Sequence, residues 1–229
     1  MPQITSGEVH LWLFRQTTPL PSGWNPSHHL SKPEVDRSAR FKFSVDQERY
    51  WVRHSVLRNF LVRYGALTAN DLQPLPLANG KPGPIGGIHF NLSDSDHLAV
   101  IAVSSHPVGV DIERARALAD LEPIVDRFFA PAEAEALHLL EGVERVCAFW
   151  RCWARKEAFL KCTGEGLTRD LGSFVVPVVA PRQLLIHDAG LTYCLSDFSA
   201  GKGFVGAVAV VGPNLRVRQR FIQAADLVS

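Results

Sequence analysis

Two carboxylates that could do chemistry lie side by side in a short stretch of the chain. Residues 108–114 read VGVDIER, an alternation typical of a β-strand with one buried apolar face. Because successive strand side chains point to opposite faces, Asp111 and Glu113 project together from the other face. Two adjacent carboxylates repel each other. The pattern therefore indicates either a wetted strand face or part of a cation site.

A second stretch supplies another carboxylate and two lysines. In residues 149–161, FWRCWARKEAFLK, the side chains of Trp153, Glu157 and Lys161 recur every fourth residue and so share one stripe of an α-helix. Lys156 adjoins Glu157 and points to a neighbouring part of the helix surface. Carboxylate oxygens suit Mg²⁺, which takes its other ligands from water and substrate phosphates. Nearby lysines would neutralise those phosphates.

Each motif taken alone also has a plain structural interpretation. A D-x-E pattern is common on solvated strand faces, and Glu157 with Lys161 forms an ordinary i, i+4 helix pair, worth about 0.3–0.5 kcal/mol. Neither spacing is specific by itself. The chemical hypothesis depends on the combination of the two stretches.

The elements that must position these groups are helices followed by strands, in both halves of the chain. In the first half we predict a strand over 8–14, a helix from about Asp46 to Gly65, and strands over 88–96, 97–105 and 108–114. In the second half we predict helices over 121–140 and 142–166, then strands over 173–179, 184–187, 191–198, 203–212 and 216–221.

This order predicts an α+β fold with two similar, pseudo-twofold subdomains, each with helices packed on a small antiparallel sheet. We place the boundary between residues 1–106 and residues 107–229. The chain of 229 residues is long enough for two such units with a real core.

Composition excludes several classes of protein. The net charge of +1 gives no general attraction to nucleic acid, and no apolar run approaches the roughly 20 residues of a membrane span. The first residues lack a basic segment followed by an apolar one, so we expect no secretory signal. The four cysteines form no C-x-x-C pair and no disulfide framework. We therefore expect free thiols and a cytoplasmic location.

The two stretches together resemble the signature pair of the 4′-phosphopantetheinyl transferase superfamily. The matching positions of GVDIE and WARKEAFLK are Gly109, Asp111, Glu113, Trp153, Lys156, Glu157, Ala158 and Lys161. Further segments follow in the family's order: ARF with Asp46 and Arg49, GKP at 80–82, FNLS at 90–93, RFF with Glu133, and GEGL at 164–167. The resemblance covers most of residues 36–170. The two-half layout is similar to the larger, monomeric, surfactin-synthetase-activating type.

The resemblance implies an enzyme that transfers the 4′-phosphopantetheine of coenzyme A to a serine of an apo acyl, polyketide or peptidyl carrier protein, releasing 3′,5′-ADP. It implies that Asp111, Glu113 and Glu157 hold Mg²⁺, although Mn²⁺ accepts the same oxygen ligands. Glu157 would also be the base for the carrier serine. By the same resemblance, Lys156 would contact the transferred phosphate, and Lys161 would stabilise charge on the departing ADP.

The resemblance also implies residues that bind the nucleotide of coenzyme A. Arg37 aligns best with a family phosphate-binding position, Lys81 with the residue beside the adenine, and Ser93 with a phosphate contact. Arg40 and Arg49 are further candidates for the 3′-phosphate, but they are equally candidates to pair with carboxylates of their own segment or with helix ends.

One position departs from the family pattern. Asp94 follows FNLS, where the family usually has a histidine that contacts the diphosphate of coenzyme A. A carboxylate facing a diphosphate is unfavourable unless a cation intervenes or the side chain turns away. We predict that Asp94 turns away while Ser93 keeps its phosphate contact. His89 and His97 are candidates to replace the missing histidine.

Two other functions stay open at this point. The chain could be a non-catalytic module that binds coenzyme A or a carrier protein, or another Mg²⁺-dependent phosphotransferase that acts on a nucleotide. Dependence on coenzyme A would distinguish the phosphopantetheinyl transferase from another nucleotide phosphotransferase. The carrier would dock near the border between the two halves, with contacts from residues 115–129 and the helix near Pro131. We expect no nucleic-acid or membrane partner.

Overall fold

The computed structural model describes residues 4–16, 24–65, 81, 83–179 and 181–227. Its α-helices are α1 (Lys32–Ser38), α2 (Ser44–Arg63), α3 (Leu121–Phe128), α4 (Pro131–His138) and α5 (Gly142–Thr163). Its strands are β1 (Glu8–Arg15), β2 (His89–Ser95), β3 (Leu98–Ser104), β4 (Val108–Arg114), β5 (Gln183–Asp188), β6 (Leu191–Phe198), β7 (Phe204–Val211) and β8 (Arg216–Phe221). None of these helices is both long and apolar enough to cross a membrane.

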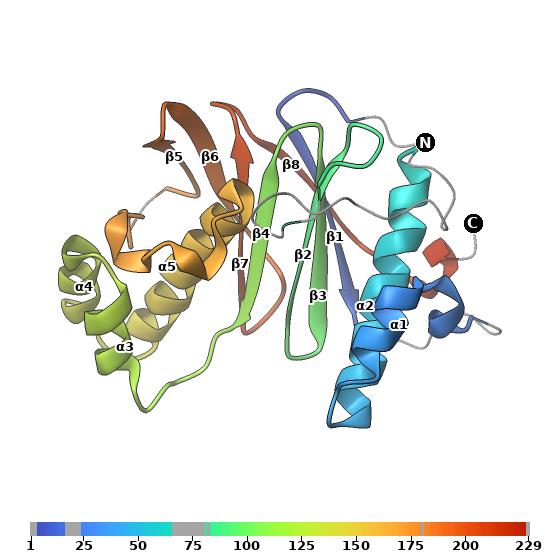
Figure 1. The fold of residues 1–229 in the computed structure, drawn as a ribbon. Coiled ribbons are helices and arrows are strands. Elements are labelled where there is room, and N and C mark those ends of the chain that lie inside the picture. Colours follow the sequence, from blue (N-terminus) through green and yellow to red (C-terminus); the bar gives the residue numbers. More distant parts are fainter. Residues whose placement is uncertain (1–3, 17–23, 66–80, 82, 180, 228–229) are drawn as a thin grey trace.

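The strands form two four-stranded sheets. The first sheet has the order β2-β3-β1-β8 and the second the order β4-β7-β6-β5 (Figure 1). All pairs are antiparallel except β1 with β8. The predicted α+β class, with helices packed on two small, mainly antiparallel sheets, is confirmed.

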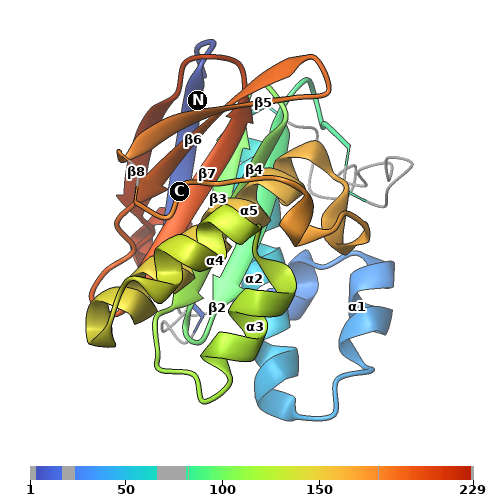
Figure 2. The ribbon, with the colours of Figure 1, turned by 90° about the vertical axis from the view of Figure 1, so that its left-hand side faces the viewer.

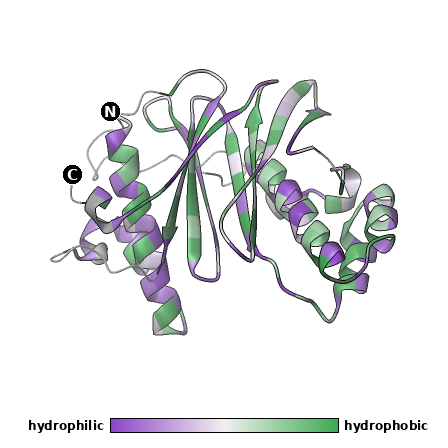
Figure 3. Cartoon of the chain, turned by 180° about the vertical axis from the view of Figure 1, so that it is seen from behind, coloured by the Kyte–Doolittle hydropathy of each residue, from purple (hydrophilic) through white to green (hydrophobic). Residues whose placement is uncertain are grey.

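The two sheets pack face to face between two layers of helices (Figures 1 and 2). One apolar cluster joins the inner faces of the sheets, with Leu11 and Val100 on one side and Val110 and Val208 on the other. A second cluster joins α2 to the outer face of the first sheet, and a third joins α3, α4 and α5 to the outer face of the second. Figure 3 shows hydrophobic residues concentrated on the strands and polar residues alternating with apolar ones on α2.

The edge strands β2 and β4 lie side by side at what we call the β2–β4 border. They are joined by side chains: Asn91 Oδ1 accepts from the Val110 amide at 2.9 Å, and Ser95 Oγ accepts from the Arg114 amide at 3.0 Å. In Figure 1 this border lies between α5 and α2. Groups from both halves of the chain therefore meet here.

The predicted strand over 173–179 is wrong. Ser173 ends a 3-10 helix, Leu171–Ser173, and the backbone polar groups after it bind the side chains of Glu133, Arg155 and Lys156. Since those groups are satisfied by α4 and α5, no neighbouring strand is needed.

The last strand crosses between the halves. β8 pairs in parallel with β1, with Val9 opposite Val217, so the end of the chain completes the first sheet. The division into residues 1–106 and 107–229 stays a prediction. β8 belongs to the second segment in sequence but to the first sheet in space. The basic, alternating sequence of β8 predicts a strand but not its neighbour.

A short helix escaped the sequence analysis. α1 begins after Ser31, and Glu34 Oε2 accepts a hydrogen bond from the Ser31 amide at 2.7 Å. Serine followed three residues later by glutamate, with Pro33 between them, is the signal of a helix start. α2 begins at Ser44, two residues before the predicted start.

Candidate active site

The approach of α5 to β4 depends on a glycine. A Cβ atom on Gly109 would overlap the Ala158 carbonyl oxygen and the Cys162 amide nitrogen of α5. Only glycine leaves room for this contact between backbones. The helix therefore lies directly on the strand, and the next helical positions on that side reach over Asp111.

Three side chains from three elements meet at the β2–β4 border. Lys161 Nζ of α5 lies 2.6 Å from Asp111 Oδ1 of β4 and 3.1 Å from Ser93 Oγ of β2. The Ser93 hydroxyl donates to the same Asp111 oxygen at 2.9 Å. Asp111 is 3% exposed. The structure thus brings together residues that the two sequence motifs and FNLS predicted separately.

The other two carboxylates lie in the electrostatic reach of Asp111. Burial raises the pKa of Glu113 to about 7, and Asp111 adds to this shift, against a hydrogen bond from Ser95 Oγ at 2.9 Å. Burial also raises the pKa of Glu157, opposed by Lys161. Among the described residues Glu157 forms no ion pair, so the ordinary helix pair with Lys161 is not formed. Burial is the main cause of both raised pKa values, and the nearby Lys161 offsets it only in part.

The donor set suits a hard cation. Asp111 Oδ2 is buried and, within the part of the chain described, has no hydrogen-bond partner. A buried carboxylate oxygen without a partner is costly and is expected to bind a cation or a proton. As the side chains stand, however, no three His, Cys, Asp or Glu residues among those described are arranged to hold a metal ion. The oxygens fit Mg²⁺ in chemical type, and the metal site stays a prediction.

The side chain of Lys156 lies away from the β2–β4 border in this structure, and its contact with phosphate stays a prediction. Its side chain is fully buried, and Nζ donates to the carbonyl oxygens of Leu171 and Phe174, both at 2.7 Å. Nζ also pairs with Glu133 Oε2 at 2.8 Å, and Glu133 is 1% exposed. One helical step of about 100° separates Lys156 from Glu157 and turns it away from the border. In this structure the partners of Lys156 are therefore structural ones.

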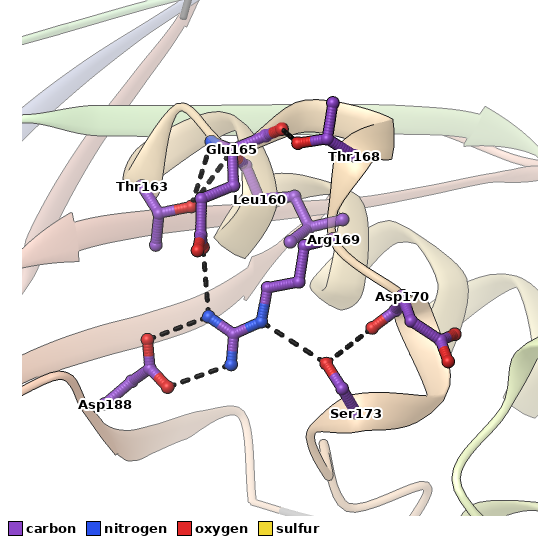
Figure 4. A network of polar contacts seen from close by, with 8 residues as sticks. All are labelled: Leu160, Thr163, Glu165, Thr168, Arg169, Asp170, Ser173 and Asp188. Atoms are coloured by element: carbon purple, nitrogen blue, oxygen red, sulfur yellow. Dashed lines mark hydrogen bonds and ion pairs between the residues drawn. The ribbon is translucent and has the colours of Figure 1, made fainter.

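A polar network holds the segment that receives Lys156. Arg169 makes two hydrogen bonds to Asp188 of β5, at 2.8 and 2.9 Å, and one to Glu165 at 2.9 Å (Figure 4). Its Nε also donates to Ser173 at 3.4 Å. Because Leu171 lies between these partners, the network fixes the carbonyl group that accepts from the buried lysine.

Asp94 turns toward α2. Its Oδ2 accepts from Arg53 Nη1 at 2.8 Å and from Gln16 Nε2 at 3.3 Å. A cation thus intervenes at this position. Of the two histidines considered, His97 pairs with Asp96 and packs on Phe204. The sequence analysis missed Arg53, although it follows Arg49 by one helical turn and so lies on the same side of α2.

The three arginines predicted to bind the nucleotide, Arg37, Arg40 and Arg49, form no ion pair with a carboxylate among the described residues. Arg37 and Arg40 line a depression of about 550 Å³ with Pro33 and Phe41. The buried Arg49 Nε has no hydrogen-bond partner within the described part of the chain. The alternative in which Arg40 or Arg49 pairs with a carboxylate is not seen among the described residues.

Lys81 has a different position. Its Nζ donates to the carbonyl oxygen of Val108 at 3.0 Å and to that of Cys162 at 3.1 Å. The ammonium group therefore links the start of β4 to the end of α5. Its predicted place beside the adenine is untested.

A second depression adjoins the carboxylates. It measures about 450 Å³ and is lined by Ser95, Asp96, Glu113, Arg114, Arg116 and Trp150. The Trp150 indole donates to the Arg116 carbonyl oxygen at 2.8 Å, which fixes one wall. The depression therefore adjoins Glu113, between the end of β2 and Trp150 of α5.

Comparisons with known proteins agree with this geometry. A profile of the 4′-phosphopantetheinyl transferase superfamily matches residues 107–209. The chain is 34% identical over 221 residues to the 4′-phosphopantetheinyl transferase HetI of Nostoc sp., covering 92% of each chain. It is 28% identical over 189 residues to the 4′-phosphopantetheinyl transferase Sfp of Bacillus subtilis, covering 81% of this chain and 84% of Sfp. The chain therefore belongs to the 4′-phosphopantetheinyl transferase superfamily.

Proposed function

We propose that this enzyme transfers the 4′-phosphopantetheine of coenzyme A to a serine of apo acyl or peptidyl carrier proteins and releases 3′,5′-ADP. The observation that carries the proposal is the meeting of Lys161, Asp111 and Ser93 at the β2–β4 border, with Glu113 and Glu157 beside them. Phosphoryl transfer depends on positioning and charge neutralisation, and both kinds of group are present. The four free cysteines favour work in the cytoplasm, and we propose a monomer.

In this proposal Asp111, Glu113 and Glu157 hold Mg²⁺. When bound, the ion neutralises the diphosphate of coenzyme A and orients it for displacement. The unpartnered Asp111 Oδ2 and the raised pKa of Glu113 support this choice of ligands.

Glu157 accepts the proton of the carrier serine. Burial raises the pKa of this carboxyl, which brings it nearer to the neutral range where general bases work best. Lys161 is 29% exposed, so its ammonium can reach a bound phosphate while it stays near Asp111. It would stabilise the charge that develops on the departing 3′,5′-ADP.

Arg37, Arg40 and Arg49 bind the nucleotide end of coenzyme A. Guanidinium groups form strong, paired hydrogen bonds to phosphate oxygens. Ser93 contributes its hydroxyl to the diphosphate. The depression next to Glu113 is the proposed entry for the carrier serine, since it is lined by Glu113 and by Arg116 of the segment 115–129.

The test is intact mass spectrometry of an apo acyl carrier protein and an apo peptidyl carrier domain, each incubated with the enzyme, coenzyme A and Mg²⁺. We expect a mass gain of one phosphopantetheine, which EDTA abolishes and added Mg²⁺ restores. Asp111→Ala should abolish the gain, whereas Glu135→Ala, an exposed carboxylate of α4, should not.

Two other outcomes would replace the proposal. Binding of coenzyme A without a mass gain on either carrier would favour a non-catalytic binding module. Transfer of phosphate from another nucleotide, with no dependence on coenzyme A, would favour a different phosphotransferase.

A further inference from the structure

Arg53 of α2 has a fixed guanidinium group at the end of β2. One hydrogen of Nη1 is donated to Gln16 Oε1 at 2.7 Å and the other to Asp94 Oδ2 at 2.8 Å. The side chain is only 15% exposed. Because both Nη1 hydrogens are used, the plane and direction of the guanidinium are set by β2 and by the residue after β1 as well as by α2.

The other donors of this guanidinium have no hydrogen-bond partner among the residues that the structure describes. A guanidinium carries five N–H donors, of which Nη1 uses two. Among the described residues no acceptor bonds to Nε or Nη2 of Arg53, and neither atom is buried. Three donors of a rigid, planar group therefore face solvent. This is the arrangement that recognises a phosphate oxygen pair.

The position of Arg53 relates it to the candidate active site. Its partner Asp94 directly follows Ser93, whose hydroxyl bonds to Asp111. β2 is the edge strand of its sheet and lies beside β4, with α2 on one side of the border and α5 on the other (Figure 1). Arg53 contacts β2 through Asp94 on the side that faces α2, and Lys161 contacts β2 through Ser93 on the side that faces β4.

We propose that Arg53 binds the diphosphate of coenzyme A and that Asp94 and Gln16 are its positioning residues. This deepens the proposed function and rests on it. The charge of the Asp94 carboxylate is already paired with Arg53 Nη1, which limits its repulsion of the anion. Arg53 thus supplies a cation next to the position where the chain lacks a histidine.

The experiment measures the affinity of the full-length protein for coenzyme A and for dephospho-coenzyme A by calorimetry, without a carrier. Arg53→Ala should raise the Kd for coenzyme A about 10- to 100-fold, as expected for the loss of charged hydrogen bonds. Arg53→Lys should recover only part of the affinity, because lysine lacks the planar fork. Asp94→Asn, which keeps an acceptor for Arg53, should have a smaller effect.

Dephospho-coenzyme A separates the diphosphate from the 3′-phosphate. Arg53→Ala should weaken both compounds by the same factor, since both carry the diphosphate. Loss of the preference for coenzyme A over dephospho-coenzyme A would overturn the assignment to the diphosphate. In steady-state transfer, the KM for coenzyme A should rise while the KM for the carrier stays unchanged.

Arg216→Ala, an exposed arginine on β8, is the matched control and should bind coenzyme A as the unchanged protein does. Thermal unfolding identifies any variant that fails to fold, and Arg53→Lys then serves in place of Arg53→Ala. An unchanged Kd for a folded Arg53 variant would refute the inference. A wild-type protein that binds coenzyme A but transfers nothing would refute only the proposed function.

Discussion

The two long helices α2 and α5 have matching places in the fold but hold their charges differently. Each covers the outer face of one sheet and presents a cation to a side chain of β2. In α5 this cation is Lys161, bonded to a buried aspartate, Asp111. In α2 it is Arg53, bonded to Asp94, which is 36% exposed. The carboxylate is thus more buried in the α5 pair, whereas the cation is more buried in the α2 pair, with Lys161 29% and Arg53 15% exposed.

Each helix also carries a second ion pair farther from the border. Lys156 and Glu133 join α5 to α4 with side chains that are 0% and 1% exposed. Arg58 and Glu34 join α2 to α1 with side chains that are 7% and 20% exposed. A charge left alone in a fully buried site is far more costly than one that water can reach. The comparison suggests that α5 is a rigid support for catalysis and that α2 holds the nucleotide segment less firmly.

The largest effect should come from breaking the buried pair of α5. Lys156→Met leaves Glu133 buried without its cation, and we expect the free energy of unfolding to fall by about 3–5 kcal/mol. Urea denaturation would measure it. Adding Glu133→Gln, which removes the charge but keeps an acceptor for the backbone amides, should recover part of the loss, and Lys202→Met on the surface should change little. A Lys156→Met protein of normal stability that had lost transfer would support the phosphate role and remove the contrast.

The border pair of α5 should matter for activity and not for folding. Asp111→Asn keeps an oxygen for Ser93 and Lys161 but removes the charge, so we expect transfer to fall by more than about 100-fold. The free energy of unfolding should change by less than about 2 kcal/mol. Carrier modification followed by mass spectrometry and urea denaturation give the two values. Full activity in this variant would contradict the proposed metal ligands.

The ion pair between Arg58 of α2 and Glu34 of α1 should make the free energy of unfolding depend on pH. Burial alone would raise the pKa of the Glu34 carboxyl, but hydrogen bonds from His54, Ser31 and Arg58 lower it to about 2. A lowered pKa means that the unfolded chain binds the proton first. This stabilisation, up to about 3 kcal/mol, is present above pH 4.5 and is lost as the pH falls toward about 2.

The test is urea denaturation of the unchanged protein and of Glu34→Gln between about pH 6 and pH 2.5. The unchanged protein should lose more stability over this range than the variant. If the free energy of unfolding changed equally with pH in both proteins, the pair of Glu34 and Arg58 would contribute nothing. The ion pairs of α2 and α5 would then differ in strength more than proposed. Glu48→Gln, an exposed glutamate of α2, is the control.

The smallest expected effect concerns Gly109, which allows α5 to lie directly on β4. Gly109→Ala places a methyl group against the backbone of α5, which must move away from β4. We expect a loss of about 1–3 kcal/mol in the free energy of unfolding, as for other overpacked sites. Transfer should weaken as well, because Lys161 moves with the helix. Melting curves and transfer rates would check both, and transfer at the normal rate would show that the close approach is not needed.

Local patterns were sufficient to predict much of this protein. Strand alternation put Asp111 and Glu113 on one face, and helical spacing put Glu157 and Lys161 on one stripe. The same patterns gave the α+β class and nearly all the strands. These predictions succeed because the direction of a side chain relative to its own element depends only on the local backbone.

What an element packs against was decided by the tertiary structure alone. Lys156 and Lys161 have similar surroundings in sequence, yet one is enclosed by the carbonyl groups of residues 171–174 and the other reaches the border. The pairing of β8 with β1 and of Arg53 with Asp94 joins residues far apart in the chain. Such partners depend on how whole layers pack, and no periodicity within one segment records that.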